Sequence, residues 1–529
     1  NSFCTLLAMA RVTARAALKY GCGAWAVGTG ALLVPPRETL PAPLLRYRVT
    51  CEGLWRMGRC AVVGAQIAYA YKASPLDNDT PQAEWDVMHE WAAGRLVELA
   101  EANGAMYVKA GQGFSQMSHL LPRTYCRVMR SLEDCVAFRP ISEIYAVIER
   151  DLGKSVDELF ESFDEQPLAA ASLAQVHRAR LRGCGREVAV KVQYIDVADR
   201  FDGDLFAIRT CLKVCGVLFP GYDWGPLVQR SDHTLRAELD FAAEARNADR
   251  CGVEMRARFG DAVTTPTVVH ELSTPRVMMT DFIKGCKITD RAGIEAMGLS
   301  VTAAAEQFVE AMAYQIFRTG FVHADPHGGN VFVRPRPGKP SQPQVVLLDH
   351  GLYTTLTEAD TKLLSTVYTA AVRREDDRLK ACCEQMGVDA NVFNVLASMF
   401  LFFPYDVFSP FKFRASEEEL HRMRYEAAKE MNKYTELLNV MPIEYGLVLR
   451  NMNTVRAVVK DLGNPVRRSA IMLRYSIVTS DAHLSWFAMQ WTLLKLAALE
   501  WYNGMLLAFA RWQDPALFEA AEDSMLTLG

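Results

Sequence analysis

The segment between residues 323 and 351 constrains this chain more than any other. It reads HADPHGGN at residues 323–330, continues through a β-rich run, and ends in LLDHG at residues 347–351. Asp325 is followed five residues later by Asn330, and Asp349 opens an Asp-x-Gly turn after a hydrophobic strand. Carboxylate and amide oxygens are the hard ligands that Mg²⁺ takes when it carries nucleotide phosphates. The segment therefore predicts a metal-and-phosphate site, with Asp325 beside the transferred phosphate and the metal held by Asn330 and Asp349.

The phosphate-gripping half of such a site is expected upstream, and a strand with a lysine is present there. The sequence VAVKV at residues 188–192 carries Lys191. In protein-kinase-like sites this lysine pairs with the α- and β-phosphates and with a glutamate on the next helix. The partner is predicted to be Glu244, within the helix-forming stretch 237–247. Asp240 stands one turn before Glu244 and is predicted to share its helix face.

A hinge and a further helix complete the order. Residues 276–285 read as a strand that ends in polar residues and glycine, which predicts a hinge where the backbone of Asp281 and Ile283 meets the adenine. Residues 302–319 read as a helix that leads into the 323–330 segment. Each signal is weak alone because short motifs match by chance. Their shared order predicts a kinase-like fold.

Each signal also has a purely structural interpretation. Lys191 could be a solvated lysine on an edge strand, residues 349–351 a simple Asp-x-Gly turn, and Glu244 a residue on a solvent-exposed helix face. His323 and His327 have no His or Cys companions at metal-site spacing, so structural roles are expected for both. His327 stands two residues after Asp325, where many protein kinases have lysine. After residue 351 there is no Ala-Pro-Glu and no long activation segment, and Thr357 predicts the start of a helix.

The expected glycine-rich phosphate loop is replaced by an alanine-rich one. Residues 167–177 read PLAAASLAQVH, without Gly-x-Gly-x-x-Gly. Backbone N–H groups can still cradle phosphate there, although alanine lacks the freedom of glycine at positive φ. A short alanine helix is the alternative, but the flanking strands favour a loop and hairpin. The predicted phosphate-binding residues are Ala169, Ala170, Ala171 and Ser172.

One more motif gives the set a family resemblance. Residues 109–112 read KAGQ within a helical region, and residues 238–240 form a Glu-x-Asp pair. Together with the alanine-rich loop and the 323–330 segment, they resemble the UbiB-like atypical kinases, also called aarF-domain-containing kinases. The resemblance covers about residues 85–355. The sequence RNMNTVR at residues 450–456 looks most like the fifth paralogue type of the animal proteins.

The resemblance implies an α+β, protein-kinase-like two-lobed fold that uses ATP with Mg²⁺ or Mn²⁺. Asp325, Lys191 and Glu244 are then the catalytic residues. The family also implies a motif that folds over the active site and restricts peptide substrates. The residues of this chain that match it are Lys109, Gly111 and Gln112 with Glu238 and Asp240. Relatives support coenzyme Q biosynthesis at the inner mitochondrial membrane, and protein phosphorylation by them is doubtful.

The division of the chain follows from these positions. Residues 1–45 form a transit-like or membrane segment with a linker, and 46–140 a helical extension. Residues 141–285 form the N-lobe and hinge, and 286–529 the C-lobe with C-terminal helices. The first 37 residues are basic without an acid, which is typical of a mitochondrial transit segment. Residues 20–36 are uncharged and at the short limit of a membrane span; an apolar leader or a buried helix is the alternative.

Composition narrows the function classes. The net charge is −4, which gives no support for nucleic-acid binding. The 13 cysteines are scattered without Cys-x-x-Cys, which is typical of reduced thiols inside the cell. We therefore expect an ATP-dependent enzyme that acts on or near a lipid or small molecule at a membrane, with mitochondrial protein partners. A nucleotide-binding scaffold without phosphoryl transfer stays open. An antibiotic-kinase-like phosphotransferase is a third reading, against which KAGQ argues.

Overall fold

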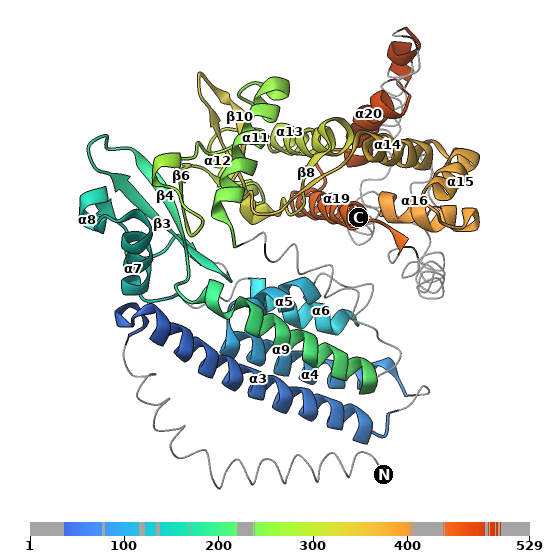
Figure 1. The fold of residues 1–529 in the computed structure, drawn as a ribbon. Coiled ribbons are helices and arrows are strands. Elements are labelled where there is room, and N and C mark those ends of the chain that lie inside the picture. Colours follow the sequence, from blue (N-terminus) through green and yellow to red (C-terminus); the bar gives the residue numbers. More distant parts are fainter. Residues whose placement is uncertain are drawn as a thin grey trace. The chain divides into compact units, whose positions relative to one another are not determined.

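The computed structural model describes residues 36–76, 80–115, 122–133, 138–170, 172–218, 236, 239–402, 405, 437, 440–481, 485, 487–491, 494–495 and 498. The chain divides into two compact units (Figure 1). The first unit is Asn1–Leu235 with Glu271–Met279, and the second is Arg236–His270 with Thr280–Gly529. The two units do not test the division into four parts that the sequence predicts, and that division stays a prediction.

The first unit begins with helices. They are η1 (Arg37–Thr39), α3 (Ala42–Ala73), α4 (Gln82–Asn103), α5 (Met106–Ser115), α6 (Arg123–Met129), η2 (Arg130–Glu133), α7 (Ile141–Leu152), α8 (Val156–Leu159) and α9 (Val197–Leu218). Prolines stand directly before α3, α4, α6 and α7, where their fixed φ and missing N–H suit a helix start. Helices α3 and α9 pack side by side (Figure 1).

The sheet of the first unit has five strands. They are β1 (Phe160–Phe163), β2 (Ala169–Ala170), β3 (Ala174–Leu181), β4 (Glu187–Gln193) and β6 (Val277–Asp281), of which β6 extends into the second unit. The order is β1-β3-β4-β6, and β2 pairs with β3. Alternate residues Val188, Val190 and Val192 of β4 are fully buried, as period-two patterning requires. Helix α7 packs on β4.

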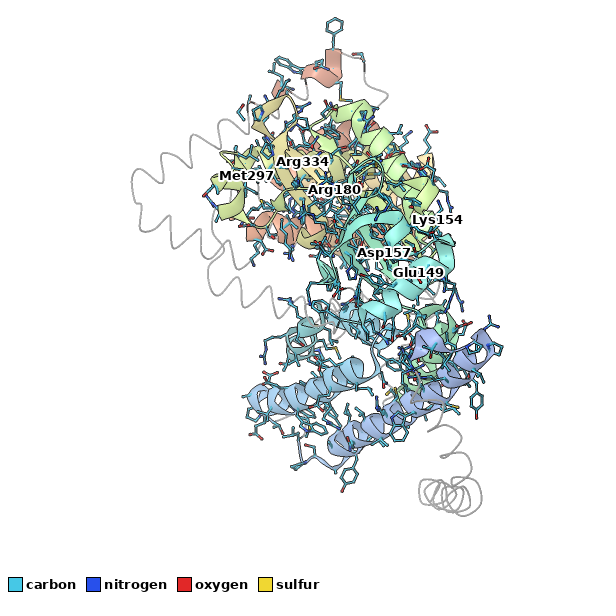
Figure 2. The ribbon with its side chains drawn as sticks, turned by 90° about the vertical axis from the view of Figure 1, so that its left-hand side faces the viewer. Glu149, Lys154, Asp157, Arg180, Met297 and Arg334 are labelled. Carbon is cyan, nitrogen blue, oxygen red and sulfur yellow. The ribbon has the colours of Figure 1, made fainter. Side chains whose placement is uncertain are left out.

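A capped turn joins α7 to α8. Ser155 accepts a hydrogen bond from the Glu158 N–H, and the Glu158 carboxylate accepts one from the Ser155 N–H, so the two residues form a capping box. Figure 2 labels Glu149, Lys154 and Asp157 around this turn. Gly153 ends α7 in the left-handed conformation, with φ 65°. The turn therefore fixes the path of the chain from α7 through α8 to strand β1.

Buried charges join the helices of the first unit. Asp196 precedes α9, is fully buried, and lies 2.6 Å from Arg37 and 3.3 Å from Arg139. Arg200 of α9 contacts both Asp196 and the buried Asp204. Burial alone would raise the pKa of Asp196, but the charges of Arg139, Arg37 and Arg200 outweigh burial and lower it. The cluster ties η1 and the residues before α7 to α9.

The second unit holds the remaining elements. Its helices are α11 (Phe241–Phe259), α12 (Arg291–Ala296), α13 (Val301–Tyr314), η4 (Gln315–Thr319), η5 (Gly328–Asn330), α14 (Glu358–Arg373), α15 (Asp376–Gln385), η6 (Ala390–Val392), α16 (Phe393–Leu401), α19 (Ile443–Asp461) and α20 (Arg468–Ser480), while η3 (His270–Leu272) straddles the unit boundary. Its strands are β5 (Val263–Thr264), β7 (Cys286–Lys287), β8 (Phe321–His323), β9 (Val331–Arg336), β10 (Lys339–Leu347) and β11 (Tyr353–Thr355). One sheet has the order β5-β10-β9-β7, and β8 pairs with β11 in a second.

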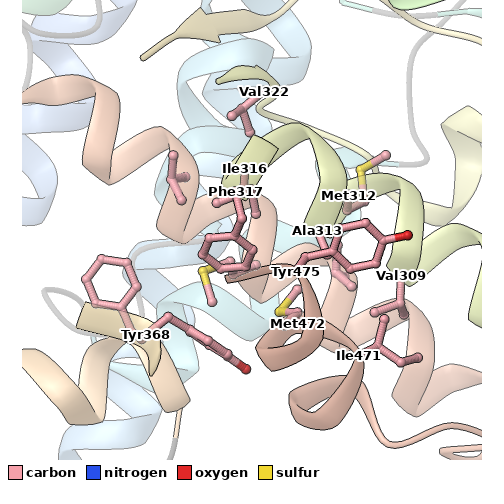
Figure 3. Close-up of a cluster of buried hydrophobic side chains, with 14 of the residues drawn as sticks. Val309, Met312, Ala313, Ile316, Phe317, Val322, Tyr368, Ile471, Met472 and Tyr475 are labelled. Atoms are coloured by element: carbon pink, nitrogen blue, oxygen red, sulfur yellow. The ribbon is translucent and has the colours of Figure 1, made fainter. Parts of the chain in front are cut away.

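A large apolar core supports the second unit. Figure 3 shows part of it, where side chains from α13, η4, β8, α14 and α20 meet. Phe317 and Tyr368 are almost fully buried, and their ring centroids lie 5.3 Å apart. Met312 of α13 and Met472 of α20 are also fully buried. This core holds the helices on which β8 and the following loop rest.

The predicted α+β class is confirmed. The predicted helix at 302–319 is present as α13 followed by the π-helical turn η4, and Thr357 caps α14 in a capping box with Asp360. No described helix combines the length and apolar composition needed to cross a membrane. The membrane prediction for residues 20–36 falls almost entirely outside the described residues.

Two apolar stretches are more exposed than their composition suggests. Residues 60–71 belong to the longer α3, where Val62 and Tyr69 are 57% and 76% exposed. The second stretch is the apolar run 484–494. Its described large side chains Phe487, Trp491 and Leu494 are exposed. Apolar composition alone therefore overestimates burial in both places.

Candidate active site

Strand pairing brings the predicted metal-and-phosphate residues together in the second unit. His323 of β8 lies opposite Tyr353 of β11, and the Ala324 N–H donates to the Leu352 carbonyl at 3.0 Å. At the other end, Leu347 of β10 lies opposite Val331 of β9. The loops that carry Asp325, Asn330 and Asp349 therefore start from neighbouring strand ends.

Three hydrogen bonds within the segment then hold these loops. The Leu348 N–H donates to the Asn330 carbonyl at 2.8 Å, and Asn330 Nδ2 donates to the Asp325 carbonyl at 3.5 Å. The Gly351 N–H donates to Asp349 Oδ1 at 2.9 Å, so the Asp-x-Gly turn forms as predicted. The structure thus connects Asp325, Asn330 and Asp349 within one loop system.

The oxygen donors of this system fit a Mg²⁺ or Mn²⁺ ion. The Asn330 amide donates through its nitrogen, so its side-chain oxygen is left to face a cation. Among the described residues, no group of three or more His, Cys, Asp and Glu side chains forms a metal cage. Mg²⁺ in nucleotide sites typically takes one or two protein carboxylates and completes its shell with phosphates and water. Asn330 and Asp349 would hold such an ion together with the nucleotide.

Buried neutral groups support the loop from below. The Asp325 N–H donates to His323 Nδ1 at 3.1 Å, and the His323 N–H donates to Gln315 Oε1 at 3.0 Å. Burial lowers the pKa of His323 to about 4, so the ring is neutral near pH 7. Burial, together with the neighbouring Cys251, raises the pKa of Tyr353 far above its usual value. The structural role expected for His323 is confirmed.

His350 and His327, which flank the same loops, also form hydrogen bonds within the local structure. His350 is almost fully buried and shares a 2.9 Å hydrogen bond with the Tyr353 hydroxyl. His327 Nδ1 accepts from the Gly329 N–H at 3.2 Å. The π-helical turn η4 places the fully buried Gln315 under the loop, a role that its sequence position did not reveal.

Glu244 lies close to the Asp-x-Gly turn. It is 4% exposed on α11, and a Cβ built on Gly351 would lie 3.7 Å from Glu244 Oε2. The prediction that Asp240 shares a helix with Glu244 is wrong, because the helix begins at Phe241. Asp240 is its N-cap and accepts from the Ala242 N–H at 3.0 Å. The helix-forming residues before position 240 suggested that the helix begins earlier. Aspartate is also favoured as an N-cap, and here Asp240 marks the start of the helix. Glu238 lies outside the described residues.

The residues predicted to bind the phosphates lie in the first unit. Ala169 of β2 pairs with Val176 of β3, which pairs in turn with Lys191 of β4. The alanine-rich segment is therefore a hairpin, as predicted, and the alternative of a short helix is wrong. Ala170 pairs with Gln175, Ser172 is buried at the bend, and Ala171 lies outside the described residues. Pairing of Lys191 with Glu244 stays a prediction because they belong to different units.

The KAGQ motif lies on α5 in the first unit. Gln112 Nε2 donates to the Leu132 carbonyl at 2.9 Å. A Cβ on Gly111 would lie 2.3 Å from Leu132 Cδ1, so any larger residue at this position would require the Leu132 side chain to shift. Lys109 lies one turn of helix before Gly113 on the same element. Gly111 and Gln112 thus have a local packing role, and the covering role implied for the motif stays a prediction.

The residues predicted to form the hinge include a boundary between the two units. The boundary between the units falls between Met279 and Thr280, inside β6. The Asp281 N–H donates to the Thr267 carbonyl at 3.0 Å, and the strand ends there. Ile283 follows in an irregular stretch. Adenine binding by Asp281 and Ile283 stays a prediction.

Sequence reasoning missed the contacts that α19 makes with the residues around Asp325. Arg450 Nη2 donates to Asp325 Oδ2 at 2.8 Å. The next residue, Asn451, is fully buried and donates to the His323 carbonyl at 2.6 Å. An Arg-Asn pair inside the apolar pattern of residues 445–459 was the available signal, since buried polar residues on an apolar face need partners.

Comparisons with known proteins identify the family of this chain. The profile of the ABC1 atypical kinase-like domain matches residues 131–383. A probable serine/threonine-protein kinase, abkD, from Dictyostelium discoideum is 36% identical over 74% of this chain, which spans 56% of that protein. AarF domain-containing protein kinase 1 from Mus musculus is 33% identical over 79% of this chain and 80% of its own length.

The similarity of this chain to a solved structure is weaker than its similarity to these sequences. The Rv3197–erythromycin complex from Mycobacterium tuberculosis has 21% identity and a TM-score of 0.43, covering 72% of this chain and 94% of that one. The animal relatives given by the comparison carry the name AarF domain-containing protein kinase 1, so the predicted fifth paralogue type gains no support. The matched domain and these relatives do establish the family: the chain belongs to the ABC1, or AarF-domain, atypical kinases.

Proposed function

We propose that the chain is an atypical kinase or ATPase that uses ATP with Mg²⁺ or Mn²⁺. The observation that carries the proposal is the loop system in which Asn330 bonds the Asp325 backbone and Asp349 closes its own Asp-x-Gly turn. In kinase-like sites these three residues position the acceptor and hold the metal. Membership of the ABC1 family supports the same reaction class.

The chemistry assigns a role to each residue. Asp325 accepts the proton of the acceptor, which is a hydroxyl or a water, as its oxygen bonds to the γ-phosphorus. The bond to the ADP oxygen breaks, and its electron pair stays on ADP. Mg²⁺, when bound, neutralises phosphate charge. Lys191 orients the phosphates, and the neutral His323 fixes Asp325 through its backbone N–H. Phosphoryl transfer depends largely on such positioning.

We further propose that the acceptor is a lipid or small molecule near the inner mitochondrial membrane, with coenzyme Q or lipid metabolism as the setting. Two sequence features support this: the basic, acid-free residues 1–37, and the lack of an activation segment. In the structure, β11 and the capped helix α14 follow the Asp-x-Gly turn at once, which leaves little chain for a peptide-docking platform. Mitochondrial protein partners are part of the same proposal.

The test is ATP turnover by the purified protein with Mg²⁺, with and without cardiolipin-containing vesicles, beside Asp325→Asn. Turnover that rises with vesicles and falls to background in Asp325→Asn is the expected result. The control is Asp199→Asn, an exposed aspartate on α9. Turnover by Asp325→Asn at the wild-type rate would remove Asp325 from the reaction.

A nucleotide-gated scaffold is the second candidate. The observation that favours it is the bond from Arg450 to Asp325, which occupies one oxygen of the carboxylate in this structure. Tight Mg-nucleotide binding without turnover, with and without vesicles, is the result that this candidate predicts. Binding and turnover measured on the same sample therefore separate the two candidates.

A further inference from the structure

We propose that Arg450, on helix α19, is a catalytic residue that contacts the transferred γ-phosphoryl group. The inference rests on the proposed function, because it takes Asp325 as the residue beside that phosphate. Arg450 Nη2 lies 2.8 Å from Asp325 Oδ2. A guanidinium at hydrogen-bond distance from this carboxylate is next to whatever group Asp325 contacts. Residue 450 lies beyond the matched domain, which ends at residue 383.

Helix α19 holds Arg450 firmly in place. Asn451 is fully buried and donates to the His323 carbonyl, so adjacent residues of one helix bond both ends of the segment His323–Asp325. At the start of the helix, the Tyr445 hydroxyl donates to Asp360 Oδ1 at 2.6 Å. A cation fixed in advance stabilises developing charge without reorganising during the reaction.

The contact with Asp325 leaves donors available. A guanidinium has five N–H donors, and the bond to Asp325 uses one. Among the described residues, the buried Nε of Arg450 has no hydrogen-bond partner, and 29% of the side chain is exposed. Arginine matches phosphate oxygens with paired donors. Arg450 therefore has the capacity to hold Asp325 and a phosphate oxygen at once.

The surrounding charges explain why such a residue is needed. Many protein kinases place a lysine two residues after the catalytic aspartate, where this chain has His327. His327 turns Nδ1 to the Gly329 N–H and serves the local turn. As the acceptor oxygen bonds to the γ-phosphorus and the bond to ADP breaks, negative charge is spread over the phosphoryl oxygens. Arg450 supplies the positive charge there from a distant helix.

An inhibitory clamp is the competing interpretation of the same contact. Arg450 engages Asp325 through Oδ2, and within the described parts of the chain Oδ1 accepts no hydrogen bond. One carboxylate oxygen is thus left to take the proton of the acceptor. A residue that only blocked Asp325 would be expected to engage both oxygens, as arginine commonly does with carboxylates.

The experiment compares Arg450→Gln and Arg450→Lys with Lys460→Gln. Lys460 is a cation on the same helix, about 15 Å further along its axis. Affinity for Mg-ADP and for a non-hydrolysable Mg-ATP analogue is measured with ATP turnover. Arg450→Gln is expected to lose about tenfold in affinity for the analogue while Mg-ADP binding stays within about twofold. Turnover falls about 100-fold, Arg450→Lys is intermediate, and Lys460→Gln matches wild type.

Three outcomes would overturn the inference. They are unchanged analogue affinity in Arg450→Gln, an equal loss for ADP and the analogue, and turnover that rises, which would identify a clamp. If wild type binds nucleotide without turnover, the proposed enzyme fails and Arg450 has no catalytic role, but the ADP-against-analogue comparison still decides whether Arg450 contacts the γ-phosphate. If Arg450→Gln does not fold by circular dichroism, Arg450→Lys carries the same comparison, because it keeps the charge and loses the paired donors.

Discussion

The two units bury polar groups in different ways. In the first unit, the carboxylates of Asp196 and Asp204 are buried with the guanidinium groups of Arg37, Arg56 and Arg200 around them. In the second unit, the loop before Asp325 rests on neutral groups, which include the His323 ring, Gln315 and Asn451. Buried charges in low dielectric attract one another strongly and join helices, while the neutral network positions the backbone around Asp325 through directional hydrogen bonds.

The difference shows where each unit is vulnerable. Removing one partner of a buried ion cluster leaves the others uncompensated, so the first unit depends on single residues far apart in sequence. The loop that carries Asp325 depends on protonation, because His323, which accepts a hydrogen bond from its backbone, is held neutral by burial. The following variants test this contrast.

The largest stability effect is expected at Asp196. Asp196→Asn keeps the side-chain shape but leaves Arg37, Arg139 and Arg200 without their shared buried anion. We expect the free energy of unfolding to fall by about 3–5 kcal/mol in urea denaturation. Asp199→Asn, which removes the exposed partner of Arg46, should change it by less than about 1 kcal/mol. Equal stability of Asp196→Asn and wild type would refute the anchoring role of the cluster.

Acid should act on the second unit through His323. The folded-state pKa, about 4, lies below the ordinary value of 6.5. The unfolded chain therefore binds more protons between these two values, and stability falls as the pH falls from 6.5 to about 4. The loss from His323 approaches about 3 kcal/mol. His323→Asn, whose amide oxygen can accept the Asp325 N–H, should flatten this pH dependence in denaturation curves.

A control separates His323 from histidines in general. His270 has a half-exposed side chain and lies beside Asp249. His270→Asn should leave the pH dependence between 6.5 and 4 in place. If the slope persists in His323→Asn and vanishes in His270→Asn, the neutral network beneath Asp325 is not the source of the acid sensitivity.

A smaller effect is expected where α5 meets η2. A Cβ at position 111 would lie 2.3 Å from Leu132 Cδ1, whereas a Cβ at Gly113 on the same helix meets no atom within 4 Å. Gly111→Ala should cost about 1–3 kcal/mol through overpacking. Gly113→Ala should be neutral or stabilise by up to about 1 kcal/mol, since alanine favours helix. Thermal denaturation of both variants measures the difference. Equal melting temperatures would show that Leu132 moves aside without cost, so that the packing of α5 on η2 does not require glycine at position 111.

The smallest effect belongs to an exposed ion pair. Arg246 and Asp240 lie 3.5 Å apart, with side chains 67% and 45% exposed. Arg246→Gln should change the free energy of unfolding by less than about 1 kcal/mol. If Arg246→Gln lost as much free energy of unfolding as Asp196→Asn, burial would not determine how much an ion pair contributes to stability. The contrast between the units would then fail.

Sequence patterns predicted the parts of the site whose residues are close in the chain. Asp325, Asn330 and Asp349 lie within 25 positions and are joined by β9 and β10, so local strand patterning was sufficient. The hairpin at Ala169 followed from flanking strands in the same way. The KAGQ motif contributed to the family resemblance, and the matched domain and relatives confirmed that family.

Long-range polar contacts could not be predicted in this way. Arg450 is 125 residues from Asp325, and on an amphipathic helix an arginine reads as solvated. Asp196 with Arg37 is a pair 159 residues apart, and neither residue stands out in composition. Such pairs depend on how helices pack, and a single sequence gives no information on which charged residues meet.

Binding of Mg-nucleotide by wild type and Asp349→Asn tests the central claim most directly. Asp349 is placed by its own turn to Gly351, so the change removes a metal-binding charge while the amide can keep the turn. We predict Mg²⁺-dependent binding of ADP by wild type and a loss of at least about tenfold in Asp349→Asn. Mg-nucleotide binding of equal strength in both proteins would contradict the assignment of residues 323–351 as the metal-and-phosphate site.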